Sequence, residues 1–462
     1  MIKRNHIKQG KRRTPARKIA MSFFMVIVVG TLLLMLPAAH RNQQAYPFVD
    51  ALFTATSATC VTGLVIDVTL TEFTLFGQVV IMTLIQIGGL GLMTIVAVCI
   101  LFFKSKLTMH EKITMKEMLN QDGAFNMKQF LMDILKYTFL FESIGALLLA
   151  IRFLPKYGFA LGMFKSLFIA VSAFCNAGFD ILGNNSLMDV AHDPLIMLTI
   201  ICLIVLGGLG FAVWFDLRDK LKIMFKKHSS KRKFWKSLNF HTRIVLTVTA
   251  FLIFFGTLLI FLLERNNPST LQNKSLPQQL LVSLFEAVTL RTAGFASVDY
   301  GALTLATKYM MVLIMFIGGS PGGTAGGIKT TTAVILLMYI ISNVKGKAQT
   351  VMMKRTISKE LIIRAMGIFF INLLTLLLGI FLLCIFEVQD FISIVFEATS
   401  ALATVGLTLG ITGALTTVGK LVIIFLMFVG RIGITTLFLS LISQHSTVDH
   451  SATYPNGSII VG

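Results

Sequence analysis

A short motif ending in glycine recurs four times along this chain of 462 residues, and it constrains the fold more than any other feature. The four glycines, Gly63, Gly178, Gly294 and Gly406, follow one another at intervals of 115, 116 and 112 residues. The motifs themselves are SATCVTGL, SAFCNAGF, TLRTAGF and SALATVGL. A nearly constant period indicates repeated structural units. We therefore expect the chain to consist of four versions of one unit.

A short apolar segment with a phenylalanine near its start precedes each glycine: DALFTAT, KSLFIAV, VSLFEAV and SIVFEAT. At roughly ten to twelve residues, each segment is shorter than the about 20 residues that a helix needs to cross a bilayer. Each therefore predicts a re-entrant half-helix followed by a loop at membrane depth. Such a loop is tolerated where its backbone lines water or protein. Four loops could close a ring whose carbonyls replace the hydration shell of a monovalent cation.

Composition places the chain in a membrane. Hydrophobic residues make up 55% of the sequence and charged residues 13%, which is typical of an integral membrane protein. The net charge of +20 falls in blocks between apolar stretches, so we interpret it as topology-setting charge and not as a nucleic-acid surface. The cysteines lie in apolar segments without metal-ligand spacing and are expected to be small core residues: Cys60, Cys99, Cys175, Cys202 and Cys384.

Eight apolar stretches, two in each unit, are candidates for membrane spans. They lie near residues 19–36, 78–103, 134–154, 194–215, 244–263, 309–341, 361–386 and 420–442. With two spans per unit, every unit starts and ends on the same side, so the repeats are parallel and not inverted. Thirty of the 41 lysines and arginines lie in segments 1–18, 104–136, 217–243 and 342–364. The positive-inside rule puts these segments and both termini in the cytoplasm.

The predicted fold is an all-α polytopic membrane protein with four parallel pseudo-repeats around a central pore. Each repeat is a helix, a re-entrant half-helix with its loop, and a second helix. The predicted divisions are a basic cytoplasmic tail at 1–18, repeats at 19–104, 134–216, 243–341 and 361–442, and a C-terminal tail at 443–462. The second span of the third repeat is expected to be broken. Histidine spacings suggest no metal site, and no motif points to an enzyme.

The residues just before each glycine are small or hydroxylated, which lets four loops approach closely while their carbonyls point inward. The alternative is that these residues merely allow close helix packing, but the recurrence after four half-helices favours a filter for a dehydrated monovalent cation. The candidate ion-binding residues are Thr59, Cys60, Val61, Thr62 and Gly63; Cys175, Asn176, Ala177 and Gly178; Arg291, Thr292, Ala293 and Gly294; and Ala403, Thr404, Val405 and Gly406.

The fourfold half-helix and glycine loop resembles the superfamily of Trk, Ktr and HKT potassium transporters, over nearly the whole chain. The short chain with four bare units looks most like the Ktr-type ion-conducting membrane subunit. In that family the four filter glycines favour potassium, and a serine in the first loop is associated with sodium permeation. Gly63 stands there in this sequence, so the resemblance implies potassium as the transported ion. The third loop is one residue shorter between Phe285 and Gly294.

The second span of the third unit contains IGGSPGGTAGGIKTTT, whose glycines and proline cannot continue a helix. We expect a flexible loop below the filter, and the resemblance implies an intramembrane gate over Gly318 to Thr332. The candidate gate residues are Gly318, Gly319, Gly322, Gly323, Gly326, Gly327, Lys329 and Arg431. A weaker alternative is a phosphate-binding loop of the G-x-x-x-x-G-K-T type. Lys329 is interpreted either as a snorkelling cation or as a gate charge.

Arg431 stands in VGRIG, where the first two units have IGGLG and LGGLG. A positive group there opposes cation passage, and the resemblance implies that it lies under the filter against the gating loop. The alternative is a buried partner for an acid such as Glu142. Arg291 is interpreted as scaffolding that bonds loop carbonyls or reaches Glu286 and Glu397.

Acidic residues follow the first three glycines on the predicted outer face. They could raise the local cation concentration at the pore mouth, or they could simply be solvated loop carboxylates, and both alternatives stay open. These residues are Asp67, Glu72, Asp180, Asp189, Asp193 and Asp299.

The resemblance also implies a homodimer on a cytoplasmic ring of KtrA-like regulatory subunits with nucleotide-binding RCK domains, so a nucleotide would act through the partner and no cofactor is expected in this chain. The basic loop 217–243 is a candidate docking face, although contact with anionic membrane lipids explains the same charges. Sodium stimulation stays open. The alternatives in function are an ion-coupled cation symporter and a non-conducting membrane scaffold or receptor.

Overall fold

The computed structural model describes residues 15–91, 127–183, 185–227 and 231–433. Over these ranges the chain is almost entirely helical, with one hairpin of two short antiparallel strands, β1 (Val351–Met352) and β2 (Arg355–Thr356). The predicted tail 443–462, most of the tail 1–18, and Cys99 lie outside the described residues.

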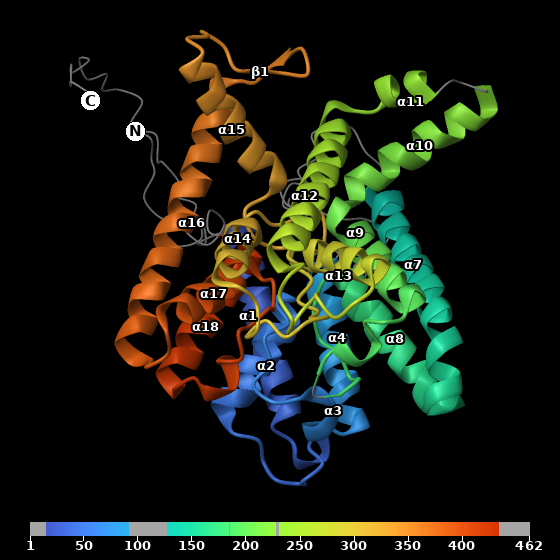
Figure 1. The fold of residues 1–462 in the computed structure, drawn as a ribbon, viewed down its shortest axis with the longest axis vertical. Coiled ribbons are helices and arrows are strands. Elements are labelled where there is room, and N and C mark those ends of the chain that lie inside the picture. Colours follow the sequence, from blue (N-terminus) through green and yellow to red (C-terminus); the bar gives the residue numbers. More distant parts are fainter. Residues whose placement is uncertain (1–14, 92–126, 184, 228–230, 434–462) are drawn as a thin grey trace, which may run out of the picture.

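Each unit contains a first span, a half-helix and a second span, as predicted (Figure 1). The first spans are α1 (Pro15–Leu34), α7 (Met127–Tyr157), α12 (Phe240–Glu264) and α16 (Lys359–Phe386). The half-helices are α2 (Phe48–Cys60), α8 (Phe159–Cys175), α13 (Leu276–Thr289) and α17 (Phe391–Ala403). The second spans are α4 (Leu75–Leu90), α9 (Pro194–Leu209), α14 (Leu305–Phe316) continued by α15 (Thr330–Val344), and α18 (Thr417–Ile432).

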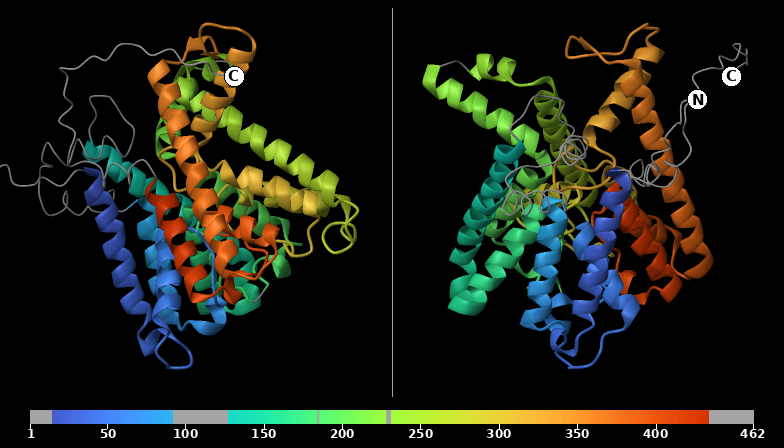
Figure 2. Two further views of the ribbon diagram at one scale, coloured as in Figure 1. Left: turned by 90° about the vertical axis from the view of Figure 1, so that its left-hand side faces the viewer. Right: turned by 180° about the vertical axis from the view of Figure 1, so that it is seen from behind.

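The remaining elements are short connections or extensions. They are α3 (Thr69–Glu72), α10 (Phe211–Lys227), α11 (Lys231–Ser237) and the 3₁₀ turns η1 (Pro37–Ala39), η2 (Met188–Val190) and η3 (Thr412–Ala414). The hairpin, α10 and α11 lie at one end of the molecule, and α3 lies at the other (Figures 1 and 2).

The half-helices are 13 to 17 residues long, which is too short to cross a bilayer alone. Local signals fix where two of them begin. A capping box formed by Ser275 and Gln278 starts α13. The carboxylate of Asp390 accepts a hydrogen bond from the amide of Ser393 at 3.2 Å and caps α17. The prediction of re-entrant half-helices is confirmed.

The units are arranged in a closed cycle. In every unit the second span packs against the half-helix of the next unit: α4 on α8, α9 on α13, α14 on α17, and α18 back on α2. Within each unit the half-helix also packs on its own first span. Since the chain runs through the units in order and the fourth contacts the first, the four half-helices surround a common centre.

The second spans differ from the prediction. Continuous helices were expected over 78–103, 194–215 and 420–442, but α4, α9 and α18 end before Gly91, Gly210 and Gly433. These glycines have φ of 79°, 90° and 87°, which is left-handed backbone that a helix cannot continue through. After Gly210, α10 leaves α9 at 99°. The expectation of a continuous span over 194–215 was therefore wrong.

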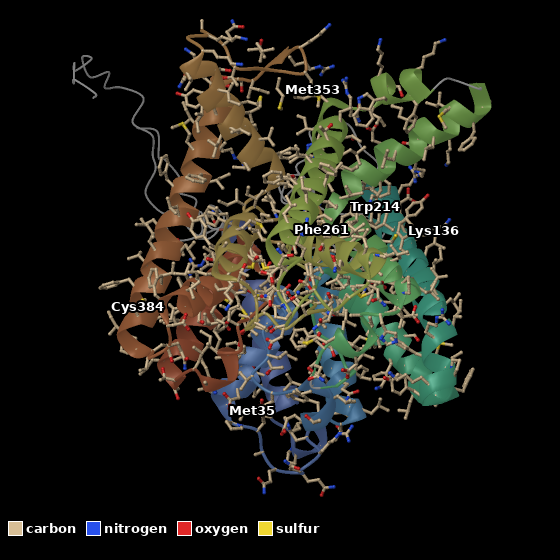
Figure 3. The ribbon with its side chains drawn as sticks, viewed as in Figure 1. Met35, Lys136, Trp214, Phe261, Met353 and Cys384 are labelled. Carbon is tan, nitrogen blue, oxygen red and sulfur yellow. The ribbon has the colours of Figure 1, made fainter. Side chains whose placement is uncertain are left out.

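Length and composition identify three described helices able to cross a membrane alone, within Gln129–Tyr157, Phe240–Glu264 and Lys359–Phe386, or four if α9 and α10 count as one bent span. Their exposed surfaces are strongly apolar, as on α16, where Phe370, Leu377 and Phe381 are more than half exposed. Figure 3 shows Met353 near the hairpin end, Met35 near the opposite end, and Cys384 on α16.

The expectation that every cysteine is a core residue was wrong for two of them. Cys60 and Cys175 are buried, but Cys202 and Cys384 are exposed on the apolar surface, and all four are free thiols. The apolar environment that the sequence indicated is therefore the lipid-facing surface as well as the protein core.

Candidate functional site

The four half-helices end in one backbone geometry. Two positions before each predicted filter glycine, a residue with a side chain adopts left-handed backbone: Val61 (φ 56°), Asn176 (58°), Thr292 (70°) and Thr404 (51°). The glycines also have positive φ: Gly63 (98°), Gly178 (72°), Gly294 (79°) and Gly406 (94°). A left-handed residue ends a helix and turns the chain. The recurrence of both features confirms that the four motifs are structurally equivalent.

The four glycines meet in a ring. A Cβ atom placed on each one would collide with the carbonyl oxygen of the residue just before the next unit's glycine: Ala177 for Gly63 at 2.6 Å, Ala293 for Gly178 at 2.8 Å, and, closer still, Val405 for Gly294 and Thr62 for Gly406. The contacts therefore pass from each unit to the next and return to the first. Glycine is required here for both its backbone angle and its lack of a side chain.

In the first and fourth units, a serine four positions after the phenylalanine of the half-helix, Phe53 or Phe396, anchors the loop. The carbonyl of Ser57 accepts a hydrogen bond from the amide of Thr62 at 2.8 Å, and its hydroxyl accepts one from the amide of Gly63 at 3.1 Å. Ser400 does the same for Val405 at 2.8 Å and Gly406 at 3.0 Å. The backbone of each loop is thus held from behind by its own half-helix.

The second and third units vary this anchor. In the second, the carbonyl of Ser172 accepts the amide of Ala177 at 2.8 Å. In the third, Thr289 accepts the amide of Ala293 at 2.9 Å and its hydroxyl donates to the carbonyl of Phe295 at 2.8 Å. The third loop is therefore one residue shorter than the others between Thr289 and the left-handed residue Thr292.

All predicted filter residues lie around this ring, and nearly all are buried. In the described part of the chain, the hydroxyl groups of Thr59, Thr62, Thr292 and Thr404 are buried without a hydrogen-bond partner. Buried polar groups normally have a partner. Buried hydroxyls on other helices, such as those of Thr138 and Thr249, also lack a partner among the described residues, so this feature is not specific to the filter loops.

Arg291 is buried beside the third loop, but not in the arrangement expected. Among the described residues, its Nε and Nη2 atoms have no hydrogen-bond partner. Glu286 instead accepts hydrogen bonds from the amide and hydroxyl of Ser297 at 3.0 and 2.6 Å. Glu397 accepts one from Thr412 at 2.5 Å. The hypothesis that Arg291 pairs with these acids is wrong, since each acid accepts hydrogen bonds from the segment that follows its own half-helix.

The second spans approach the half-helix ends through glycine. A Cβ atom on Gly88, Gly207 or Gly430 would overlap the carbonyl oxygen of Thr59, Phe174 or Leu402, respectively. Each of these carbonyls belongs to the next-to-last residue of a half-helix. The third unit departs from this pattern, because a Cβ atom on Gly318 would meet Gly326 of the inserted loop.

The predicted gate, Gly318 to Thr332, covers the segment between α14 and α15 and the first three residues of α15, and it lies against α9 of the second unit and the filter loop of the fourth. Its residues Ser320 and Thr324 donate their amides to the carbonyls of Gly208 and Gly207 at 3.1 and 3.3 Å. A Cβ atom on Gly326 would overlap the hydroxyl of Thr404. The segment thus contacts the second unit on one side and the fourth filter loop on the other.

The inserted loop also has internal structure at the other predicted gate glycines. Gly318 donates its amide to the carbonyl of Ile328 at 2.9 Å, and Gly319 accepts the amide of Thr330 at 3.1 Å. Gly322 accepts the amide of Phe211 at 2.9 Å. Gly323 lies close to Gly207 and Gly210, while Gly327 has φ 67° and lies against Gly318. The loop is therefore a folded plug and not an extended tether.

Arg431 fixes this loop from α18. Its guanidinium donates from Nη1 to the carbonyl of Thr324, and from Nη2 to the carbonyl of Gly88 at 2.5 Å. The first, third and fourth units are thereby joined. Glu142 is not its partner, because that carboxylate accepts from Gln86 Nε2 at 3.0 Å. The alternative of an Arg431–Glu142 ion pair is wrong, and the arginine bonds backbone carbonyls below the filter.

Lys329 donates its amino group to the carbonyl of Ala325 at 2.7 Å and precedes the first turn of α15. The lysine therefore turns back into the loop and does not extend away from it. The alternative of a phosphate-binding loop is wrong for this segment, because a helix, α14, leads into it where a phosphate loop follows a strand. No group of three or more candidate metal-ligating side chains occurs among the described residues.

The predicted outer acids each have a local partner. Four of them accept hydrogen bonds: Asp67 from the hydroxyl of Tyr46, Asp180 from the hydroxyl of Ser186 at 2.8 Å, Asp189 from the side-chain amide of Asn185 at 3.2 Å, and Asp299 from the backbone amide of Gly301 at 2.9 Å. The other two form ion pairs, Glu72 with His40 at 3.3 Å and Asp193 with Arg152 at 2.9 Å. Burial, assisted by Asp67, raises the pKa of Tyr46 above its ordinary value, so this phenol stays protonated and donates a hydrogen bond to Asp67. A shared effect on cation concentration stays a prediction.

An ion pair that the sequence did not reveal joins the fourth unit to the first at the starts of α18 and α2. Lys420 on α18 donates to Asp50, in the first turn of α2, at 2.7 Å. The two residues are 370 positions apart in sequence, and they join the fourth unit to the first. The two residues stand on different elements of the repeat, the start of a half-helix and the start of a second span, so comparison of the units gives no signal for the pair.

Comparison with known proteins agrees with this architecture. The TrkH family of cation transport proteins matches residues 2–449. The chain belongs to this family. Potassium uptake protein B of the Ktr system from Bacillus subtilis is 41% identical over 98% of this chain and 97% of its own length. The potassium/sodium uptake protein NtpJ of Enterococcus hirae is 40% identical over 98% of both.

A solved structure supports the fold. The potassium transporter TrkH from Vibrio parahaemolyticus superposes with a TM-score of 0.72, covering 95% of this chain and 86% of that one, at 19% identity. At this identity the similarity concerns the fold alone. Together these findings identify a membrane protein of a cation transport family, not an enzyme, and the resemblance inferred from the four glycine loops is confirmed.

Proposed function

We propose that this protein mediates potassium uptake across the cytoplasmic membrane through the ring at Gly63, Gly178, Gly294 and Gly406. The observation that carries the proposal is the cyclic contact of each glycine with the carbonyl before the next. Backbone carbonyls converging from four sides are suited to a dehydrated monovalent cation. The membrane potential, worth about 2.3 kcal/mol per charge per 100 mV, drives the flow, so no cofactor is needed in the chain.

The coordinating oxygens in this proposal come from Thr59–Gly63, Cys175–Gly178, Arg291–Gly294 and Ala403–Gly406. Potassium as the ion is supported by the names of relatives, which are potassium uptake proteins in Bacillus subtilis and Vibrio alginolyticus. The name of NtpJ includes sodium as well. Sodium stimulation of the flux is therefore a quantity to measure alongside potassium transport.

The segment from Gly318 to Thr332 acts as the gate in this proposal, with Arg431 and Lys329 as positive charges below the filter. Support comes from the hydrogen bonds that hold the segment against Gly207, Gly208 and the guanidinium of Arg431. A cation leaving the filter meets these charges before it reaches the cytoplasm. Displacement of the segment removes the obstruction and lets the ion pass.

Regulation by a cytoplasmic partner completes the proposal. The name of the relatives, a Ktr system, indicates more than one component. We propose a homodimer on a KtrA-like ring of RCK-domain subunits, with both termini in the cytoplasm and the loop 217–243 as the docking face. The grouping of α10, α11 and the hairpin at one end of the molecule is consistent with a shared cytoplasmic surface (Figure 2). Anionic lipid contact at the same lysines is the competing outcome.

Rubidium uptake and growth at low potassium, in cells lacking their own potassium systems, test the proposal. The arms are the wild type, the wild type with a candidate RCK partner, Gly63→Ser, and Gly367→Ala, whose Cβ atom would meet nothing within 4 Å. Potassium transport predicts rescue by the wild type and Gly367→Ala, a boost from the partner, and weaker potassium selectivity in Gly63→Ser. Correctly inserted protein without uptake in any arm would reject conduction in favour of a scaffold.

A further inference from the structure

Thr324 is a residue of the inserted loop that uses all three of its polar groups on other units. Its amide donates to the carbonyl of Gly207 at 3.3 Å, and its hydroxyl donates to the carbonyl of Phe174 at 3.3 Å. Its own carbonyl accepts from the guanidinium of Arg431. The side chain is buried. One threonine thus joins the third unit to the second and the fourth, at the level just below the filter.

The carbonyl of Phe174 is a special acceptor. Phe174 is the next-to-last residue of half-helix α8, so the helix itself offers its carbonyl no amide partner. Such carbonyls carry the negative end of the helix dipole. The equivalent carbonyls of Thr59 and Leu402 lie against Gly88 and Gly430, and in the described part of the chain neither accepts a hydrogen bond from a side chain of the loop. The second half-helix is therefore distinguished by a hydroxyl donor from the loop.

We propose that Thr324 is a positioning residue that couples the gate segment to the filter by bonding the C-terminal carbonyl of the second half-helix. The inference rests on the proposed function of the ring and the loop. While the loop lies in the position seen in the structure, the Thr324 hydroxyl donates a hydrogen bond to the Phe174 carbonyl. When the loop leaves, three hydrogen bonds break together and the carbonyl becomes free to face a hydrated cation below the filter. When the loop closes the pore, the Thr324 hydroxyl therefore also makes the Phe174 carbonyl oxygen unavailable to the ion.

The test is the isosteric change Thr324→Val, which removes the hydroxyl but keeps the amide and carbonyl. Thr324→Ser restores a hydroxyl, and Thr375→Val is the matched control, because that hydroxyl donates to the carbonyl of Ile371 within α16 at 2.9 Å. Full-length protein is assayed for rubidium uptake, for potassium over sodium selectivity, and, after purification, for amide hydrogen exchange of the segment 318–328.

Thr324→Val removes one hydrogen bond and so weakens the contact of the loop with the second half-helix. We expect its maximal uptake rate to be about two- to tenfold above that of the wild type, which corresponds to the free energy of one hydrogen bond. The apparent KM for rubidium and the selectivity stay unchanged, because the glycine ring is intact. Exchange of segment 318–328 accelerates. Thr324→Ser and Thr375→Val match the wild type. A merely structural role would instead lower the uptake rate together with the amount of inserted protein.

Exchange and uptake separate this inference from the proposed function. Faster exchange in Thr324→Val with no rubidium uptake by the wild type supports the coupling and rejects conduction. Unchanged exchange of segment 318–328 overturns the coupling, whatever the uptake of the wild type. A rate increase that Thr324→Ser does not reverse also overturns it, since the hydroxyl would then not be responsible.

Discussion

The glycine loops and the segment beneath them follow opposite rules of symmetry. Around the ring, each of the four units supplies a left-handed residue two positions before a glycine, and each glycine faces a carbonyl of the next unit. Below the ring, one unit supplies a folded loop and another supplies Arg431, while the remaining units offer carbonyls to them. A site that surrounds an ion gains from equivalent ligands, whereas an obstruction needs one element that can move. In the function that we propose, the symmetric ring provides selectivity and the asymmetric segment controls the rate.

The largest expected effects come from adding a methyl group within the ring. Gly406→Ala and Gly294→Ala place a Cβ atom on the carbonyls of Thr62 and Val405, and both positions have positive φ. Overpacking and backbone strain cost about 1–3 kcal/mol each, so uptake of rubidium should fall by at least about tenfold. Gly178→Ala, with a separation of 2.8 Å, should be the mildest of the ring. Equal effects at ring positions and at Gly367→Ala would break the comparison.

A second effect of opposite sign is expected at Arg431. Arg431→Gln removes the charge and at least one of the bonds that the guanidinium makes to Thr324 and Gly88. Charge-assisted hydrogen bonds of this kind are worth about 1.5–3 kcal/mol, so the maximal uptake rate should rise by about an order of magnitude. Arg431→Lys, which keeps the charge but not the two-armed contact, should fall between Arg431→Gln and the wild type. A lower rate in Arg431→Gln at normal expression would contradict a barrier role.

A smaller increase is expected from Gly326→Ala in the inserted loop. Its Cβ atom would overlap the hydroxyl of Thr404, so the loop cannot seat fully under the fourth filter loop. Overpacking costs about 1–3 kcal/mol, and movement of the loop relieves part of that cost. Because the seated position of the loop is destabilised by the remainder, rubidium uptake should rise several-fold. Gly322→Ala is the comparison variant, since its Cβ atom would meet nothing within 4 Å while its φ of 71° makes any side chain strain the loop backbone. If Gly322→Ala gives the larger increase, loop strain and not contact with Thr404 controls the gate.

The smallest effect concerns the outer ion pair. Lys420→Met removes the partner of Asp50, and both side chains are less than one-fifth exposed. An ion pair near a surface contributes about 0–1 kcal/mol, and loss of one partner from a partly buried pair costs somewhat more. We expect the melting temperature in detergent to fall by a few degrees with little change in selectivity. The double change Asp50→Asn with Lys420→Met should be less destabilised than the sum of the single changes.

The sequence predicted the symmetric part better than the asymmetric part. The interval between Gly63, Gly178, Gly294 and Gly406 was sufficient to predict four equivalent loops, because repetition reports a shared backbone geometry. Composition alone predicted a helix break over Gly318 to Thr332, and the break in the structure ends before Thr330, where α15 begins. Contacts such as Thr324 with Phe174, 150 residues apart, carry no local sequence signal.

The helix ends at Gly91, Gly210 and Gly433 were missed for a different reason. Apolar runs such as LIVLGGLGFAVWF continue through Gly210, so hydropathy predicted an unbroken span. Glycine in a membrane helix is common, and it is the positive φ that ends the helix. The signal was present in the last glycine of IGGLG, LGGLG and VGRIG, which recurs in three units like the filter glycines themselves.

The most direct test of this division is flux into liposomes that contain purified protein, with rubidium and sodium measured for the wild type, Gly178→Ser and Arg431→Gln. The account predicts that Gly178→Ser lowers the ratio of rubidium to sodium flux, and that Arg431→Gln raises the total flux while leaving that ratio unchanged. If Arg431→Gln altered the ratio as much as Gly178→Ser does, selectivity would not reside in the glycine ring, and the separation of the two regions would be wrong.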